Sequence, residues 1–469
     1  MTPRVPSASP ALPVAPVAPV APAAPAAPAA PTDPAAPTDP AAPTGQAQQA
    51  PQAPPAARDA PRIAVVGGGM AAARFAERYG ALGGPGTVTV YGAEPRAPYN
   101  RVLLAEVLTG RYDAESIALP LGGARARPGC EVVALDPAAR TLRLADGGVE
   151  EWDELVLATG ANPVLPPVRG LRRADGRGLT EGVHTLRTLE DCTRLAEEAV
   201  GAGRAVVIGG GVLGVSAARA LAALGVRTEI VHQAPHLVER QLDPGAAAVL
   251  RERLRTLGVE CYTGNRARAV HSGTGVPPAG APGRVRAVEL ANGYRLDCDL
   301  VVLACGTRPR TALAHAAGLP VGTGVLVDDR LGVAPHVHAV GDCAEHRGTV
   351  HGLAGPAWEQ ADVLARRLSG AEPEACYPGT GPRARLSTGD LEYAAFGTVD
   401  ETLDPGLDVL RLTDATRGSY KKLVLRGDRL VGAILLGDLA TVDALAGAFA
   451  DGGAPAGHPL HLLTRGETR

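Results

Sequence analysis

The chain has 469 residues, a net charge of −3 and seven cysteines. This length is enough for two or three domains of about 100–200 residues each. The nearly balanced charge gives no reason to expect nucleic acid as a partner, and so few cysteines do not form a disulfide scaffold. No Cys-x-x-Cys pair and no set of four cysteines with zinc-ligand spacing occurs, so no metal site is expected. No run of about 18 apolar residues predicts a membrane span.

Residues 1–60 form a separate segment that holds 17 of the 42 prolines. From Pro10 to Pro43, proline recurs at every third position, mostly between Ala, Val and Thr. Proline at this density blocks helices and sheets, and the segment has no large apolar side chains to bury, so it predicts a disordered Pro/Ala-rich tail. The repeat also interrupts the apolar run that a secretory signal needs, which favours a cytoplasmic location.

The globular part opens with the pattern of a βαβ unit. The predicted elements are a buried strand at 62–66, a helix from 70 to about 82 and a strand at 87–91. In the connection between the first strand and the helix, Gly67 allows a tight turn and Gly69 lets the backbone approach a pyrophosphate, while Ala72 lets the helix pack closely on the strand. The N-terminus of such a helix attracts phosphate groups.

The same pattern returns 142 residues later. The predicted elements are a strand at 204–208, a helix from about 212 to 224 and a strand at 226–231. Gly209, Gly211 and Gly214 take the three positions of the turn. One glycine-rich turn is weak evidence, but two in one chain indicate two dinucleotide sites.

Three further segments resemble motifs of the flavoproteins that have two dinucleotide-binding domains. The strand at 337–345 contains Gly341 and Asp342, and the other two segments are 155–163, with Thr159 and Gly160, and 300–309, with Gly306. The resemblance implies that the first turn binds FAD, that the second binds the nicotinamide nucleotide, and that Asp342 accepts a hydrogen bond from the ribityl chain. A helix cap is the alternative role for Asp342.

A closer resemblance lies in residues 91–106, 239–243 and 420–432. These segments are similar to the flavoprotein portion of assimilatory NAD(P)H nitrite reductase large subunits, and to flavoprotein electron-transfer subunits of assimilatory nitrate reductases. The resemblance covers roughly residues 62–450. Rubredoxin and ferredoxin reductases share the layout, but many of them have Lys where Glu106 stands here.

The resemblance implies an α/β fold with two Rossmann-like dinucleotide-binding domains, the NAD(P) domain being inserted in the FAD domain, plus a small C-terminal α+β domain. The expected division is a disordered tail at 1–60, the first half of the FAD-binding domain at 61–165, the NAD(P)-binding domain at 166–312, the second half of the FAD-binding domain at 313–382 and the C-terminal domain at 383–469.

The expected contacts to FAD include four residues outside the glycine motifs, namely Glu94, Arg101, Trp358 and Glu359. The helix that contains Trp358 is expected to point its N-terminus at the flavin, although Trp358 has a buried anchor as its alternative role. His232 follows the second strand of the NAD(P) unit, where a carboxylate typical of NADH sites or an arginine typical of NADPH sites is expected. The choice between NADH and NADPH is therefore open, and no catalytic residue is assigned.

We expect an FAD-dependent NAD(P)H oxidoreductase that passes electrons to a separate redox protein, in nitrate or nitrite assimilation. Residues 70–129 contain no cysteine for a disulfide exit, so the electrons leave the flavin directly. Beyond residue 343 the only cysteine is Cys376, which cannot hold an iron–sulfur cluster alone, so this chain is not expected to reduce nitrite by itself.

Three alternatives stay open at this point. Two lie within the same enzyme class: a ferredoxin- or rubredoxin-type reductase, and an NADH oxidase. The third is a flavoprotein module that senses nucleotides without turnover. The identity of the electron acceptor and the formation of a homodimer are also open, and no membrane partner is expected.

Overall fold

The computed structural model describes residues 60–450 apart from 174, 274–282, 382, 390, 401 and 403, together with residues 452 and 463. The tail expected at 1–60 lies outside the described residues except for Ala60, as do most residues after 450. No helix within the described ranges is both long enough and apolar enough to cross a membrane.

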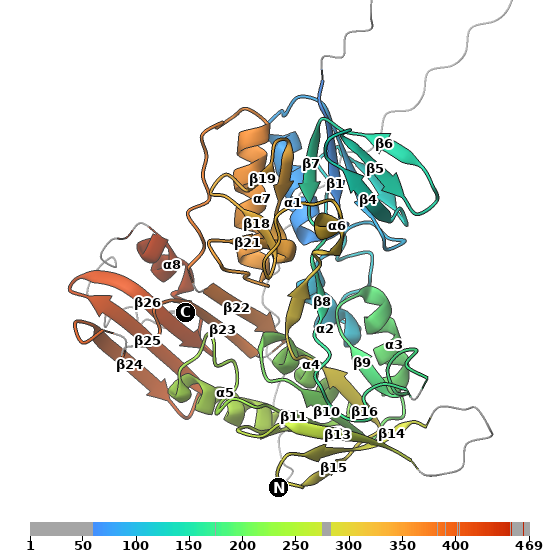
Figure 1. Cartoon of the computed structure of the whole chain (residues 1–469). Coiled ribbons are helices and arrows are strands. Elements are labelled where there is room, and N and C mark those ends of the chain that lie inside the picture. Colours follow the sequence, from blue (N-terminus) through green and yellow to red (C-terminus); the bar gives the residue numbers. More distant parts are fainter. Residues whose placement is uncertain are drawn as a thin grey trace, which may run out of the picture. The chain divides into compact units, whose positions relative to one another are not determined.

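The first glycine turn belongs to a six-stranded sheet (Figure 1). Its central strand β1 (Arg62–Val66) is buried from Ile63 onward and pairs in parallel with β2 and β7. Only β19 runs antiparallel to its neighbour. The strands in spatial order are β19 (Gly332–Ala334), β20 (Val337–Ala339), β7 (Glu154–Leu157), β1, β2 (Thr87–Gly92) and β3 (Arg125–Pro128).

The second glycine turn belongs to a five-stranded sheet in which all strands are parallel. Its central strand β10 (Arg204–Ile208) lies between β11 and β16, as β1 lies between β2 and β7. The strands in spatial order are β12 (Val259–Tyr262), β11 (Arg227–Val231), β10, β16 (Leu300–Leu303) and β9 (Val183–Thr185). The two sheets therefore repeat one Rossmann-like arrangement.

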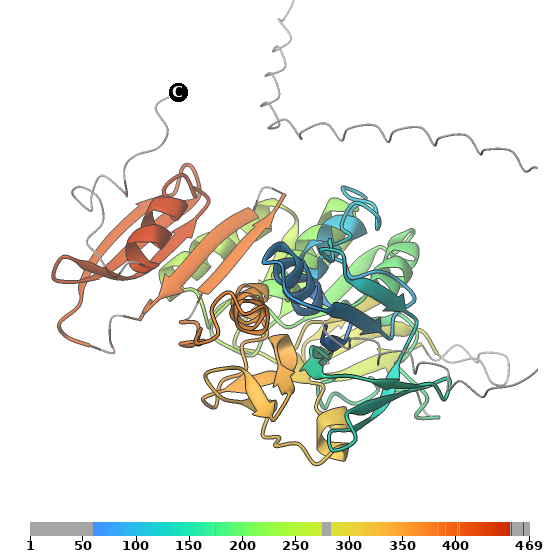
Figure 2. The same ribbon diagram turned by 90° about the horizontal axis from the view of Figure 1, so that it is seen from above.

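The helices cover these sheets or begin at the ends of their strands. In Figures 1 and 2, α1 (Met70–Ala81) and α7 (Ala354–Leu368) lie side by side, and Arg74 Nε contacts Asp362 Oδ1 at 2.7 Å between them. The remaining helices of the two Rossmann-like units are α2 (Leu104–Leu108), α3 (Leu189–Ala199), α4 (Val212–Ala223), α5 (Pro244–Thr256), α6 (Ala312–Ala316) and the 3-10 turns Arg101–Leu103 and Gly341–Cys343.

Smaller sheets accompany the two large ones. β8 (Ala161–Pro163) and β17 (Thr307–Pro309) pair antiparallel where the chain crosses between the two large sheets. The others are β4 (Val132–Asp136) with β5 (Thr141–Leu144) and β6 (Val149–Glu151), β13 (Ala267–Ser272) with β14 (Val285–Leu290) and β15 (Arg295–Asp297), and β18 (Val325–Val327) with β21 (Ala344–His346).

An antiparallel sheet and α8 (Val442–Ala450) follow in the C-terminal part. The strands in spatial order are β22 (Arg383–Thr388), β23 (Leu391–Gly397), β26 (Arg429–Leu436), β25 (Ser419–Arg426) and β24 (Asp408–Asp414). The expected fold class, with two Rossmann-like units and a smaller α+β unit, is confirmed. The residue limits of the domains stay predictions, because the sheets place strands and not domain boundaries.

Candidate functional site

The first glycine of each turn is fixed by its backbone. Gly67 has a φ of +121°, and a Cβ there would lie 2.1 Å from Ala158 O. Gly209 has a φ of +114°, and its Cβ would lie 2.2 Å from Ala304 O. Both carbonyls come from the chain just after the neighbouring parallel strand, so each turn is pressed against its sheet and excludes any side chain.

The other motif positions divide into open and packed ones. A Cβ at Gly69 or at Gly211 would meet nothing within 4 Å, although both residues line a cavity. Ala72 is fully buried, and a Cβ at Gly214 would lie 1.9 Å from Gly209 O. The second glycine therefore keeps space clear for a ligand, whereas the third position brings helix and strand together.

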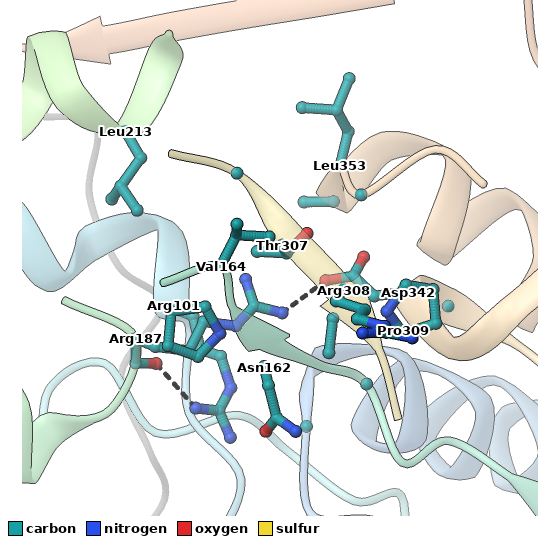
Figure 3. Close-up of a pocket in the computed structure, with 18 of the residues that line it drawn as sticks. Arg101, Asn162, Val164, Arg187, Leu213, Thr307, Arg308, Pro309, Asp342 and Leu353 are labelled. Atoms are coloured by element: carbon teal, nitrogen blue, oxygen red, sulfur yellow. Dashed lines mark hydrogen bonds and ion pairs between the residues drawn. The ribbon is translucent and has the colours of Figure 1, made fainter. Parts of the chain in front are cut away.

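Both turns open into one cavity of about 3120 Å³. Sites for drug-sized ligands usually measure about 300–1,000 Å³, so this cavity has room for two dinucleotides. Gly67–Met70 and Gly209–Leu213 line it. Strands β8 and β17 line it as well, and Figure 3 labels Asn162 of β8 and Thr307 of β17 there. Sequence motifs 142 residues apart thus meet at one site.

Helix N-termini around the cavity offer free backbone N–H groups. Among the described helices of eleven residues or more, α1, α4 and α7 begin at the cavity and have no side-chain cap. In contrast, Thr188 caps α3 and Asp243 caps α5. Unpaired N–H groups and the positive end of the helix dipole attract anions. Two of these helices follow a glycine turn, so the site fits two pyrophosphates, and α7 supplies a third positive end.

The expected FAD residues near β2 form an ionic cluster. Arg101 Nη2 contacts Glu94 Oε1 at 2.6 Å, and the hydroxyl of buried Tyr99 donates to Glu94 Oε2 at 2.6 Å. Arg101 also donates to Arg187 O at 2.9 Å, as Figure 3 shows. Gly92 contributes no carboxylate, so Glu94 is the acidic group at this end of β2, and its charge is paired with Arg101.

Residues from the segments 155–163 and 337–345 line the same cavity. Gly341 has a φ of +80° and donates its N–H to Gln360 Oε1 at 2.7 Å. Asp342 lines the cavity and forms an ion pair with Arg187, toward which it points in Figure 3. Thr159 donates its hydroxyl to Arg310 O at 2.8 Å, and Gly160 follows with a φ of +72°.

The two expected FAD residues on α7 face different ways. Trp358 is partly buried and lines the cavity. The carboxylate of Glu359 accepts the hydroxyl of Thr380 instead, and Glu359 is not among the cavity-lining residues. The geometry therefore places Trp358, but not Glu359, where a ligand in the cavity could touch it.

On the nicotinamide side, Gly306 and His232 both line the cavity. Gly306 has a φ of +95° and lies beside β17. The His232 ring is held on both nitrogens: Nδ1 accepts the N–H of Gly210 at 3.0 Å, and Nε2 lies 3.0 Å from Glu239 Oε2. Glu239 was not among the expected site residues, although it opens the segment 239–243 that carries part of the resemblance.

Two arginines were also missed. Arg187 and Arg310 line the cavity close to Arg101. Burial lowers the pKa of Arg310, and the positive charges of Arg101 and Arg187 lower it further. Such crowding of cations at a partly buried site favours an anionic ligand. Arg310 lies just beyond the predicted segment 300–309, and its position next to that motif was the available signal.

The seven cysteines are all free and all lie in the described ranges. Cys305 lines the cavity, where burial raises the pKa of its thiol to about 11, so this thiol stays protonated at neutral pH. Across the described residues, no group of three or more His, Cys, Asp or Glu side chains could hold a metal ion.

Comparisons with known proteins agree with this geometry. The model of the pyridine nucleotide-disulphide oxidoreductase family matches residues 61–361, and that of the rubredoxin NAD+ reductase C-terminal domain matches residues 382–451. A solved covalent complex of putidaredoxin reductase with putidaredoxin is similar over 86% of this chain and 95% of the other, with a TM-score of 0.74 and 26% identity.

Two relatives from Bacillus subtilis (strain 168) match over 385 residues, which is 80% of this chain. One is a nitrite reductase [NAD(P)H], 34% identical, with 46% of its length covered. The other is an assimilatory nitrate reductase electron transfer subunit, 31% identical, with 48% covered. The chain thus spans about half the length of these relatives. Because the family model covers well over half of it, the chain belongs to the pyridine nucleotide-disulphide oxidoreductase family, with FAD and NAD(P)H as its cofactors.

Proposed function

We propose that this chain takes electrons from NAD(P)H through FAD and delivers them to a separate redox protein in nitrate or nitrite assimilation. The observation that carries the proposal is the convergence of two glycine turns, each followed by an uncapped helix, on one cavity. A single turn accounts for one nucleotide, whereas two turns at one cavity suit a donor nucleotide and a flavin held together.

The residues divide into two groups. For FAD we propose Gly67, Gly69, Glu94, Arg101, Thr159, Gly160, Gly341, Asp342 and Trp358 as lining residues. Ala72 supports this site by packing α1 on its strand, and Glu359 supports α7 by accepting the Thr380 hydroxyl. For the nicotinamide nucleotide we propose Gly209, Gly211, His232 and Gly306 as lining residues, with Gly214 allowing α4 to pack closely on the glycine turn. The cofactors supply hydride acceptance and one-electron release, and the chain supplies binding, orientation and charge.

The charge around the cavity suits these roles. The helix dipole at the α7 N-terminus, Leu353–Gly355, favours negative charge on a group bound beside it. Arg310 adds positive charge near the crossing strands β8 and β17, where Arg101 is paired with Glu94 and Arg187 with Asp342. The chain thereby stabilises the anionic groups of its ligands.

The two thiols that adjoin the expected cofactor motifs, Cys305 and Cys343, are not poised as electron relays. Burial raises the pKa of Cys305, and the Cys343 thiol is fully buried with its pKa also raised by burial. Neither thiol is available as the thiolate that disulfide exchange requires. We therefore propose that electrons pass straight from the flavin to the acceptor.

The relatives support an acceptor in nitrogen assimilation, since those from Bacillus subtilis are a nitrite reductase and a nitrate reductase electron transfer subunit. A second candidate is a small iron–sulfur protein of the rubredoxin or ferredoxin kind. The match of residues 382–451 to the rubredoxin NAD+ reductase C-terminal domain favours it, as does the likeness to putidaredoxin reductase.

Acceptor assays with the purified flavin-loaded protein separate these candidates. NADH or NADPH should reduce ferricyanide in its presence, whereas nitrite or nitrate alone should give no product above background. Adding a purified molybdenum-containing nitrate reductase or a sirohaem nitrite reductase component should produce NAD(P)H-dependent turnover. Fast transfer to rubredoxin or ferredoxin, with none to these partners, would favour the second candidate.

A further inference from the structure

The loop after β11 is folded tightly against the second glycine turn. Gly210 donates its N–H to His232 Nδ1 at 3.0 Å, and its carbonyl accepts the N–H of Val238 at 2.9 Å. A Cβ at Gly210 would lie 2.5 Å from Leu237 Cδ2 and 2.8 Å from His232 Cγ. His232, at the start of this loop, and Val238 therefore both bond to the second glycine turn, and the absence of a side chain at Gly210 leaves room for them.

The ring of His232 fixes the direction of Glu239. Because Nδ1 accepts a hydrogen bond from Gly210, the ring proton must lie on Nε2, which then donates to Glu239 Oε2 at 3.0 Å. The His232 side chain is only 9% exposed, whereas that of Glu239 is 36% exposed and lines the cavity. The histidine thus acts as a buried support for a carboxylate that faces the nucleotide space.

The backbone before Glu239 is strained. Val238 has a φ of +53°, a conformation that a β-branched residue rarely adopts. Leu237 and Val238 are both buried at 1% exposure or less, so packing holds the residue in this conformation. Strained residues of this kind persist where the surrounding structure fixes them, and they are frequent at ligand sites. Here the strained residue turns the chain so that Glu239 lies against His232.

The far end of the loop is anchored as well. Asp243 caps α5 and accepts hydrogen bonds from Tyr420 Oη at 2.7 Å and from Lys422 Nζ at 2.9 Å. The Lys422 side chain is completely buried. The segments 239–243 and 420–432, which were singled out in the sequence, therefore meet in the structure, and this contact holds the end of the loop.

We infer that Glu239 is the carboxylate that recognises the adenosine ribose of the nicotinamide nucleotide and that it makes the chain selective for NADH. Rossmann-like sites usually carry this carboxylate at the end of the second strand, where His232 stands instead. Glu239, which is hydrogen-bonded to His232, places a carboxylate at the same edge of the sheet. This inference rests on the proposed use of a nicotinamide nucleotide as electron donor.

The chemistry of the two nucleotides sets the direction of selection. A carboxylate accepts hydrogen bonds from the two hydroxyls of an unmodified ribose, and it repels a 2′-phosphate. Arg240 and Arg266 also line the cavity and would attract that phosphate. Both arginines and Glu239 are exposed at this edge, but Glu239 is held in place by His232, so the positioned charge there is negative.

The binding of nucleotide fragments that lack the nicotinamide ring tests the inference. Calorimetric titration of the flavin-loaded protein should show 5′-AMP binding about tenfold tighter than 2′,5′-ADP, which corresponds to one charge-assisted interaction. Glu239→Gln should reduce this ratio to about threefold or less, and Glu239→Asp should largely keep it. Glu252→Gln on α5 removes an equal charge from an exposed side chain paired with Arg255, and should leave the ratio unchanged.

The flavin absorbance of all variants reports on folding, and the ratio of flavin bleaching rates with NADH and NADPH gives a second readout. Equal or tighter binding of 2′,5′-ADP by the unmodified protein would overturn the inference, as would an unchanged ratio in Glu239→Gln. Fragment binding needs no electron acceptor, so a failure of the proposed electron transfer would appear only in the acceptor assays.

Discussion

The two open glycines allow each nucleotide site to be blocked without disturbing the fold. We expect Gly69→Val to remove FAD from the protein, and Gly211→Val to leave it yellow but unable to be reduced by NAD(P)H. Both positions have negative φ angles in the extended region, −102° and −76°, which valine adopts readily. An added Cβ meets no protein atom within 4 Å at either position, so the new side chain projects into the space for the ligand.

The expected loss of folding stability is smaller than the expected loss of nucleotide affinity. Replacing glycine at a helix N-cap with valine should cost about 1 kcal/mol of folding stability. Blocking the approach of a phosphate removes one or two hydrogen bonds between backbone N–H groups and a charged group, worth about 1.5–3 kcal/mol each. Affinity for the affected nucleotide should therefore fall by about 10-fold to about 10,000-fold, at about 1.4 kcal/mol per factor of ten.

The assay measures flavin content by absorbance after gel filtration, and then the anaerobic bleaching rate with NADH and NADPH. Gly67→Ala is the contrasting variant, since its Cβ would lie 2.1 Å from Ala158 O, and we expect it to lose soluble protein rather than flavin alone. If Gly211→Val lost flavin while Gly69→Val kept it, the assignment of the two sites would be reversed. If both variants kept normal flavin and normal bleaching, the glycine turns would not hold the nucleotides at all.

Four further outcomes are expected. Asp342→Ala should lower flavin content, because it removes a cavity carboxylate and leaves Arg187 without its ion-pair partner; normal flavin content would contradict the proposed ribityl contact. Lys422→Met should lower the free energy of unfolding by about 3–5 kcal/mol in denaturant titrations, since it breaks a buried ion pair with Asp243. Burial alone would raise the pKa of Asp243, but hydrogen bonds from Ala246 N–H, Lys422 and Tyr420 lower it below 3.8, so its contribution is present above that pH and lost as the pH falls through the depressed value. Asp243→Asn should therefore flatten the acid limb of the stability curve, and an unchanged limb would refute the assignment. Deleting residues 1–60 should leave flavin content and ferricyanide turnover within about twofold, because the family match begins at residue 61; a large loss would show that the core depends on this segment.

The elements around the glycine turns could be predicted closely because hydrophobic runs and glycines define them locally. The strands at 62–66 and 204–208 were predicted with the limits that the structure shows, and α1 and α4 differ by a single residue at their ends. The sequence also predicts a helix from about 438 to 450, but α8 begins only at Val442. Asp438 instead accepts the N–H of Ala440 and pairs with Lys421 at 2.6 Å, so a turn replaces the first helical residues.

The contacts between distant segments could not be predicted from local patterns. Arg187 and Asp342 are 155 residues apart, and no periodicity relates them. Glu239 depends on the tautomer of His232 and on a positive φ at Val238, and neither is visible in a sequence. The roles assigned to individual cofactor residues stay predictions. The geometry reduces the set of residues that can contact a ligand in the cavity, because Trp358 lines the cavity and Glu359 does not.

The central claim is that NAD(P)H reduces a flavin in this chain, which then passes its electrons to a separate protein. Double-mixing stopped-flow spectroscopy tests it most directly: flavin-loaded protein is reduced anaerobically by one equivalent of NADH and is then mixed with a purified nitrate or nitrite reductase component. We expect the flavin to bleach in the first mixing and to regain its colour in the second, at a rate that rises with partner concentration and with matching reduction of the partner's metal centre. A flavin that forms only a persistent complex with NADH, or that recolours at the same slow rate with and without the partner, would contradict the account.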